Sequence, residues 1–210
     1  MSAMKKCPKC GSRKVAPILY GMPVFDEEME RQLNNQELYL GGCCMEETAP
    51  EYHCFGCGKN VGSPPIFLSR RGEEDYREVV TAIRFNRIEA RGGDDQVYIK
   101  RMPDGRILSD YRPAFQKALL PVRRELTEKE WSKLLDRLFC KLYVHEWAKS
   151  YQATKEDGEE WELEIRLTNR RVRNYRGENA YPPYWNELIS SFKPLLQETT
   201  IERKEGKAHG

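Results

Sequence analysis

The segment EYHCFGCGKN (residues 51–60) places two cysteines, Cys54 and Cys57, in a glycine-containing C-x-x-C turn. A second turn of this kind, CPKCGS (residues 7–12), holds Cys7 and Cys10. Glycine lets the backbone curl beneath two thiolates, and Zn²⁺ prefers four such soft ligands in a tetrahedron. Two C-x-x-C turns in one short segment therefore predict a single metal site with zinc as its ion.

The alternative interpretation of the cysteine pairs is two redox dithiols. A thioredoxin-like C-x-x-C opens a helix after a strand, whereas both pairs here lie among Lys, Pro and Gly in turns, so metal ligation is favoured. Four thiolates close the coordination shell and leave no position for an activated water. The predicted zinc is therefore structural, and it supplies folding free energy to a segment with few aliphatic residues.

Three further residues near the second pair could compete for the metal. Cys43 and Cys44 are adjacent in LGGCCMEE, and His53 precedes Cys54. We expect the two cysteines to be small buried residues of a strand and His53 to point away from the metal. Replacement of one assigned ligand by any of the three stays open as the alternative. Cys140 falls in a helical pattern and is expected in the core.

Composition indicates a folded, soluble protein with a charged surface. The 210 residues are 39% hydrophobic and 32% charged. No apolar run approaches the roughly 18 residues that span a bilayer, and MSAMKKCPKC lacks an apolar signal-peptide core, so we expect a cytoplasmic protein without membrane contact. The net charge of +2 is too small for a protein that wraps DNA, so a nucleic-acid role would rest on a local patch.

Punctuation along the chain predicts four segments: a zinc ribbon at 1–62, a linker at 63–72, an α+β domain at 73–197 and a disordered tail at 198–210. Within the ribbon, the patterns predict strands at 15–21 and 37–45. Between these strands lies a helix in 23–36 that is capped by Asp26.

The later elements are read from apolar periodicity. Strands are expected at 80–90, 96–101 and 106–111, with a further hairpin in 159–177. A helix begins after Thr127, with Glu130 as its capping-box partner. Its stripe comprises Trp131, Leu134, Leu135, Leu138, Phe139 and Leu142, which Trp147 and Tyr151 could extend. A last helix follows Pro183. The predicted fold class is α+β: an N-terminal zinc ribbon followed by an antiparallel sheet of about five strands with two helices on one face.

Two sequence patterns resemble those of known proteins. CPKCGS … VAPILYG … LGGCC … YHCFGCG resembles the N-terminal four-cysteine zinc ribbons of uncharacterised bacterial proteins. EDGEEWELEIRLTNRRVRNYRGENAYPPYW resembles a D-G-x-x-W … G-x-N-A-Y-P-P pattern that recurs in bacterial hypothetical proteins. The two patterns cover about half of the chain. The resemblance implies the zinc and the domain division but no reaction, and the second of two consecutive cysteines, Cys44, departs from it.

The sequence contains few residues in patterns typical of catalytic sites. HEWAKSY (residues 145–151) begins like the H-E-x-x-H motif of metalloproteases, but Lys149 replaces the second histidine. The chain has three histidines in all, which leaves little for general acid-base chemistry. An enzyme would have to use carboxylates such as Asp94, Asp95 or Asp157 in a pocket of the α+β domain.

A candidate binding surface comes from two clusters. Three arginines of RLTNRRVRNYRG could grip phosphates or pair with glutamates of the neighbouring strand. Two tyrosines of NAYPPYW could stack on bases or anchor a protein partner. The residues are Arg171, Arg173, Arg176, Tyr181 and Tyr184. The sequence thus favours a zinc-binding, non-enzymatic interaction module with protein or nucleic-acid contacts over an enzyme of unknown class. It does not indicate an oligomeric state.

Overall fold

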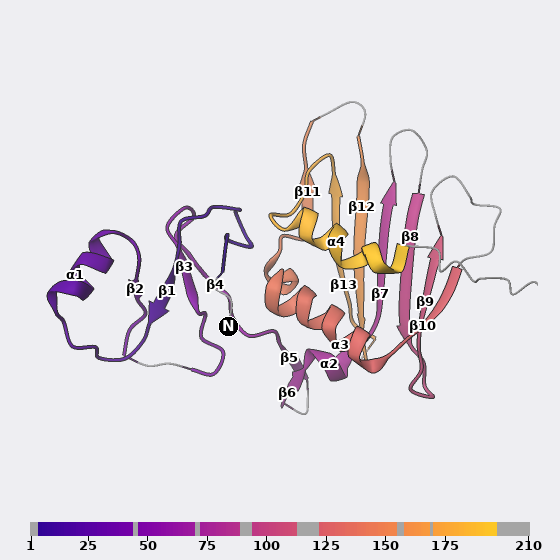
Figure 1. Cartoon of the computed structure of the whole chain (residues 1–210), viewed down its shortest axis with the longest axis horizontal. Coiled ribbons are helices and arrows are strands. Elements are labelled where there is room, and N and C mark those ends of the chain that lie inside the picture. Colours follow the sequence, from indigo (N-terminus) through magenta and orange to yellow (C-terminus); the bar gives the residue numbers. More distant parts are fainter. Residues whose placement is uncertain are drawn as a thin grey trace, which may run out of the picture.

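The structure is a computed structural model, and it describes residues 4–43, 46–69, 72–88, 94–112, 122–154, 158–168 and 170–196. Over these residues the protein is a mixed α+β molecule with four α-helices and three β-sheets (Figure 1). The α+β class predicted from the sequence is therefore confirmed. None of the helices in this described part is long and apolar enough to cross a membrane.

The N-terminal part forms a small sheet in the order β2-β1-β3-β4. Its strands are β1 (Val15–Leu19), β2 (Tyr39–Leu40), β3 (Tyr52–Cys54) and β4 (Lys59–Val61). The β1 strand pairs parallel with β2 and antiparallel with β3, and β3 pairs antiparallel with β4. The small sheet therefore brings the chain before β1 close to the hairpin of β3 and β4.

The strand expected at 37–45 is much shorter than predicted. It ends at Leu40 because Gly41 lies tightly against Ile18 and Tyr20, and Gly42 adopts a φ of 93°. Cys43 follows in an exposed bend, so the expectation that it is buried in a strand is wrong. Cys44 lies outside the described residues.

Helix α1 (Glu27–Asn34) begins as predicted, with Asp26 Oδ1 accepting a hydrogen bond of 2.8 Å from the backbone N–H of Met29. Three glutamates in its first turn interact favourably with the positive end of the helix dipole and stabilise the helix. The helix buries none of its residues, and it lies at the end of the N-terminal part farthest from the large sheet (Figure 1). Local capping, rather than packing, therefore defines where this helix starts.

The large sheet has seven strands in the order β10-β9-β8-β7-β12-β13-β11. The predicted meander corresponds to β7 (Val80–Ile88), β8 (Asp94–Arg101) and β9 (Ile107–Arg112). The predicted hairpin corresponds to β12 (Glu160–Leu167) and β13 (Val172–Glu178). Meander and hairpin join through antiparallel pairing of β7 with β12. Both predictions are confirmed.

Two edge strands were not predicted: β10 (Val122–Leu126) and β11 (Ser150–Gln152). The β11 strand pairs parallel with β13, so the sheet is mixed and not wholly antiparallel. Tyr151 lies in β11 and does not extend the helical stripe, because Tyr143 adopts a left-handed conformation (φ 51°) that reverses the chain after the helix. A short 3₁₀ turn, η2 (Val144–Glu146), follows this reversal.

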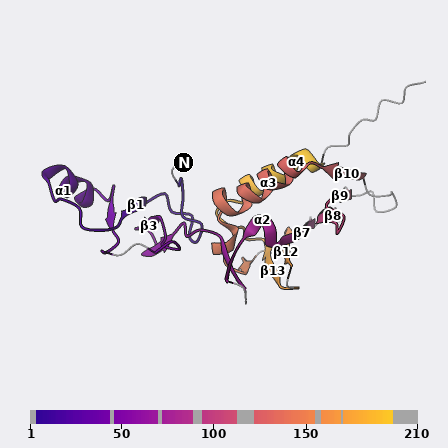
Figure 2. The ribbon, with the colours of Figure 1, turned by 90° about the horizontal axis from the view of Figure 1, so that it is seen from below.

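Helices α3 (Glu128–Asp136) and α4 (Trp185–Leu196) cover one face of the large sheet (Figure 2). Thr127 and Glu130 form the predicted capping box, and α3 continues into a π-helical turn, η1 (Arg137–Lys141). The predicted apolar stripe is confirmed, since all of its residues are buried: Trp131, Leu134, Leu135, Leu138, Phe139 and Leu142. Each large side chain buried in this way contributes about 2–3 kcal/mol of transfer free energy.

The segment 63–72, expected to be a linker, takes part in a β-hairpin through its described residues 66–69 and 72. It contains β5 (Ile66–Ser69), which pairs with β6 (Gly72–Asp75) ahead of the short helix α2 (Tyr76–Val79). Phe67 is buried and meets Phe139 edge-to-face, with ring centroids 5.6 Å apart. This apolar anchor draws the segment into the large core. The expected disordered tail at 198–210 lies outside the described residues.

Candidate metal centre

The two C-x-x-C turns have the same backbone design. The N–H of Gly11 donates to the carbonyl of Cys7 at 2.9 Å, and the N–H of Gly58 donates to the carbonyl of Cys54 at 2.8 Å. Both glycines have positive φ, 77° and 68°, which a residue with a Cβ adopts only under strain. Each turn therefore aims two sulfur atoms in one direction, and the hairpin of β3 and β4 brings the second turn against the first.

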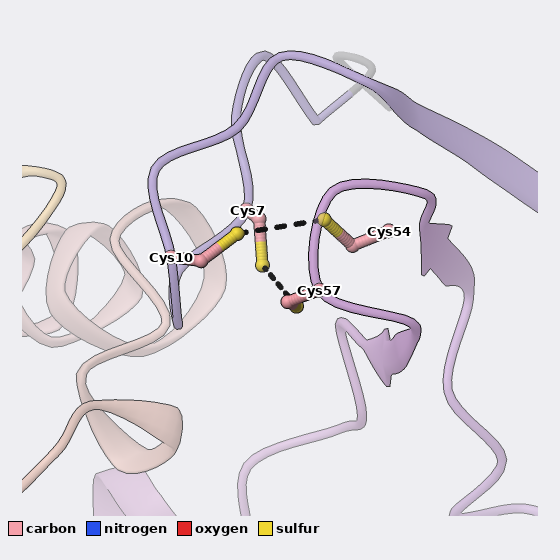
Figure 3. A group of neighbouring side chains, drawn as sticks. All are labelled: Cys7, Cys10, Cys54 and Cys57. Carbon is pink, nitrogen blue, oxygen red and sulfur yellow. Dashed lines mark hydrogen bonds between the residues drawn. The ribbon is translucent and has the colours of Figure 1, made fainter.

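The four sulfur atoms converge on one point (Figure 3). The Sγ atoms of Cys7 and Cys57 are 3.9 Å apart, those of Cys10 and Cys54 are 3.6 Å apart, and all four lie within 4.8 Å of one another. A tetrahedral ion with metal–sulfur bonds of about 2.3 Å needs sulfur atoms about 3.8 Å apart. The four cysteines can therefore hold one metal ion.

Burial and backbone dipoles act on these thiols in opposite senses. Burial raises the pKa of Cys7 to about 12, although hydrogen bonds from the backbone N–H groups of Cys10 and Lys9 act to lower it. Burial also opposes ionisation of Cys54, but hydrogen bonds from the N–H groups of Cys57 and Gly56, together with those from the thiols of Cys10 and Cys57, outweigh it and the pKa of Cys54 is lowered. A metal ion that binds the cysteines as thiolates must displace the protons that remain on them. The affinity of the site for the metal therefore falls as the pH falls.

His53 lies next to a ligand but does not join the site. Its Nδ1 atom lies 2.7 Å from Oδ1 of Asn60, and its ring stacks on Tyr39 with centroids 3.7 Å apart. These partners fix the imidazole on the side of the strand away from the sulfur atoms. The expectation that His53 points away from the metal is therefore confirmed.

The first cysteine turn is docked onto the entry of α4. The hydroxyl of Tyr184 donates to the carbonyl of Lys6 at 2.5 Å, and the Lys6 ammonium pairs with Glu187 at 3.0 Å. A Cβ on Gly11 would lie 3.7 Å from that of Pro183, in ordinary van der Waals contact. The Pro-Pro-Tyr segment thus contacts the chain on both sides of Cys7.

The chain that follows the second cysteine turn is held by η2. Oε1 of Glu146 accepts hydrogen bonds from the N–H groups of Gly62 and Ser63, at 2.7 and 2.9 Å. Nε2 of His145 donates to the carbonyl of Ser63 at 3.0 Å. Lys9, which lies between two of the cysteines, places its Nζ 3.8 Å from Oε2 of Glu146. His145 and Glu146, which resemble the start of a metalloprotease motif, therefore join the metal centre to the part of the chain that holds the large sheet.

The charge state of this junction is set by burial. Burial lowers the pKa of His145 to about 4; the Ser63 carbonyl opposes the shift, while the charges of Arg173 and Lys9 add to it. Burial raises the pKa of Glu146. The hydrogen bonds from Gly62 and Ser63 and the charge of Lys9 act to lower this pKa but are outweighed. The histidine is thus neutral in the folded protein at pH 7, which suits its role as a single donor.

We expect this histidine to make the folded protein less stable below pH 6.5. Its folded-state pKa is depressed, so the stabilisation is present above the unfolded pKa of about 6.5 and is lost as the pH falls toward 4. Between pH 7 and pH 5 the loss is about 2 kcal/mol. Urea unfolding of the metal-loaded protein at both pH values measures it.

The matched control for the pH experiment is His145→Gln. A glutamine keeps a donor in reach of Ser63 but does not titrate, while Glu146, whose raised pKa acts in the opposite sense, and the cysteines are common to both proteins. The wild type should therefore lose about 2 kcal/mol more than the variant. Equal losses in the two proteins would show that His145 is not the group that takes up the proton.

The predicted arginine cluster does not gather on one surface. Arg173 lies on the helix-covered face, with its guanidinium 4.3 Å from the ring centroid of Phe67. Arg176 lies on the opposite face, paired in register with Glu162, and Arg171 precedes β13 and is exposed. Successive residues of a strand point to opposite faces, and this alternation separates the side chains.

The two predicted surface tyrosines have different environments. Tyr181 is 41% exposed and its ring lies 4.8 Å from that of Trp185. Tyr184 is 6% exposed and bonds to Lys6, so its assignment to an exposed binding surface is wrong. Among the carboxylates suggested for an enzyme, Asp95 accepts a hydrogen bond from Tyr111, and Asp157 and the side chain of Asp94 lie outside the described residues.

The D-G-x-x-W and G-x-N-A-Y-P-P patterns meet at the end of the large sheet. Trp161 pairs in register with Gly177, and its indole Nε1 donates to the carbonyl of Ala180 at 2.9 Å. Gly158 packs against the side chain of Asn179, which itself adopts a φ of 54°. The two patterns are therefore one structural unit that sets the direction of the chain entering α4.

Compared with protein-family models and with curated proteins, this chain has no match.

Proposed function

We propose that this protein is a non-enzymatic recognition protein in which a structural zinc ion holds an N-terminal ribbon that binds a basic protein partner. Zinc suits four converging thiolates, since a closed tetrahedral sulfur shell is typical of its structural sites. The resemblance of the cysteine pattern to bacterial zinc ribbons supports the same metal. A thiolate site is maintained in a reducing compartment, so we place the protein in the cytoplasm.

The observation that carries the proposal is a group of apolar side chains left in solvent, which we call the apolar tip. It consists of Met22, Val24 and Phe25, in the loop between β1 and α1, and these are 92%, 85% and 64% exposed. Single exposed apolar residues are ordinary, but three within four positions of one loop leave a concentration of apolar surface in solvent. Covering this apolar surface with a partner is favourable, because the surface is removed from water.

The charge around the apolar tip indicates the partner's chemistry. Residues 21–51 carry eight acidic side chains and one basic side chain, a net charge of −7. An acidic surface repels phosphates and attracts Lys and Arg. With the arginines of β13 split between two faces, these features favour a basic protein segment with apolar side chains over nucleic acid.

An affinity experiment tests this function. The zinc-loaded protein is immobilised and exposed to an extract of its own cells beside two variants, Phe25→Asp and Val172→Asp. Val172 is 47% exposed on β13. Val172→Asp therefore makes the same kind of change as Phe25→Asp, an exposed apolar residue to aspartate, at a position outside the apolar tip. We expect basic proteins on the wild type and on Val172→Asp, and at least about tenfold less on Phe25→Asp, because a buried phenylalanine contributes about 2–3 kcal/mol.

Zinc content and circular dichroism of all three proteins establish that Phe25→Asp is folded. Basic proteins that are retained equally by Phe25→Asp would contradict the assignment of the apolar tip as the binding surface. Recovery of nucleic acid in place of protein would favour the other class of partner.

A further inference from the structure

A second feature, outside the apolar tip, is a cavity where the N-terminal part meets α3 and α4. It has a volume of about 460 Å³, which is within the usual range for small-molecule sites. Residues 4 and 5 line one side, the last turn of α3 with η1 lines another, and Tyr184 and Glu187 line the third. Three segments distant in sequence thus line one half-open space.

The cavity carries an excess of uncompensated positive charge. Its four cationic side chains are Lys5, Lys133, Arg137 and Lys141. Within the part of the chain that the structure describes, none of the four has a carboxylate at ion-pairing distance. The last three recur at intervals of four residues, so they lie along one side of the α3 and η1 segment.

The carboxylates of the cavity are already neutralised by cations outside its lining. Asp136 pairs with Arg77 at 2.7 Å and accepts a hydrogen bond of 2.7 Å from the hydroxyl of Tyr76. Glu187 pairs with Lys6 at 3.0 Å. The four cations therefore line a space whose own acidic groups are engaged elsewhere.

The rest of the lining is largely apolar or aromatic. Met4, Leu142, Tyr143 and Tyr184 contribute carbon surface, and Cys140 adds a thiol at the wall. The wall includes the π-helical turn, an irregularity found frequently at functional sites. Exposed cationic side chains beside carbon surface are suited to a ligand with an anionic head and an apolar body.

We propose that this cavity binds a small organic anion with an apolar body, such as an acyl carboxylate. The anionic head contacts the ammonium and guanidinium groups of Lys133, Arg137 and Lys141, and the apolar body lies against Leu142, Tyr143 and Tyr184. This site goes beyond the proposed recognition function and requires neither the apolar tip nor its partner.

Calorimetric titration of the zinc-loaded full-length protein with decanoate, below its micelle concentration, tests the site. Titrations with 1-decanol and with inorganic phosphate separate the apolar and ionic contributions. We expect decanoate to bind at least about tenfold more tightly than either comparator, since a charge-assisted hydrogen bond contributes about 1.5–3 kcal/mol. Equal binding of 1-decanol and decanoate, or no measurable binding of decanoate, would overturn the proposal.

Two variants and a chemical probe locate the site. Lys133→Gln with Lys141→Gln should weaken decanoate binding at least about tenfold, whereas Lys129→Gln, exposed on the same helix but outside the cavity, should not. Decanoate should also slow alkylation of Cys140, followed by peptide mass spectrometry. Equal effects of the two sets of variants, or an unchanged rate at Cys140, would place any bound decanoate elsewhere.

Discussion

Removal of the metal is expected to unfold residues 4–62 while the seven-stranded sheet remains folded. The hydrophobic cluster of the N-terminal part has three buried side chains, Cys7, Cys54 and Val61, and two of these are thiols of the metal site. The large cluster, by contrast, includes Phe67, Trp131 and Phe192 together with the inner faces of most strands. We therefore expect the N-terminal part, and not the large sheet, to depend on a bound ion for its stability.

The expected effect is large because a structural zinc ion supplies about 10–16 kcal/mol to a small fold at pH 7. Hydrogen exchange read by mass spectrometry, with and without a chelator, measures it. Amides of β1, β3 and β4 should exchange fully after chelation, and those of β7, β8 and β12 should keep their protection. Cys54→Ser should reproduce the chelator's effect, while Cys43→Ser, exposed and outside the tetrad, should not.

Two results would contradict this prediction. If β1, β3 and β4 keep their protection without metal, the sulfur atoms converge for some reason other than metal binding. If the large sheet loses protection together with the N-terminal part, the docking contacts of Tyr184 and Glu146 couple the two parts into one cooperative unit.

The substitution Gly177→Ala is expected to destabilise the large sheet by about 3–5 kcal/mol. A Cβ at this position would lie 2.1 Å from Nε1 of Trp161 and 2.4 Å from the carbonyl oxygen of Ala180. Neither neighbour can yield easily, because the indole is buried and the oxygen belongs to the backbone. The methyl group must displace the indole and break its hydrogen bond to Ala180, which leaves a buried donor without a partner.

Urea unfolding monitored by tryptophan fluorescence measures the loss for Gly177→Ala. The comparison is Gly158→Ala, whose Cβ would meet the side chain of Asn179 and neither a buried indole nor a backbone oxygen; the loss there should be smaller. Similar losses for the two variants would show that contact with the Trp161 indole is not the reason for a glycine at 177. A loss below about 1 kcal/mol at Gly177 would show that the sheet adjusts at this point.

The features that local chemistry determines were predictable from the sequence. The cap of Asp26, the capping box of Thr127 and Glu130, and the apolar stripe of α3 each depend on residues a few positions apart. The four sulfur atoms were also predictable, although about fifty residues separate the turns, because a C-x-x-C turn has few uses other than a partner turn on the same ion.

The features that escaped prediction depend on distant contacts. The β11 strand is three residues long and forms by parallel pairing with β13, which no local pattern indicates. Phe67 follows a Gly-Ser-Pro-Pro segment typical of a linker, and its place in the core depends on distant residues such as Phe139 and Arg173. The His145 and Glu146 pair had no sequence signal, since its partners are backbone groups of Gly62 and Ser63.

The separation of Arg173 from Arg176 follows from the sequence alone. Arg173 and Arg176 are an odd number of positions apart, so a strand must send them to opposite faces. A tyrosine next to two prolines suits binding, so the sequence predicts a surface position for Tyr184. Its hydroxyl instead satisfies a carbonyl beside the first metal ligand, 178 positions earlier in the chain.

That last contact has a consequence for the order in which the chain is made. Lys6 leaves the ribosome long before Tyr184 does, and the cysteines from 7 to 57 are complete while most of the large sheet is still untranslated. The metal can therefore be captured early by the nascent chain, as domains generally fold in order of synthesis. Docking of the first cysteine turn must wait for the segment at 182–187, so it is among the last steps of assembly.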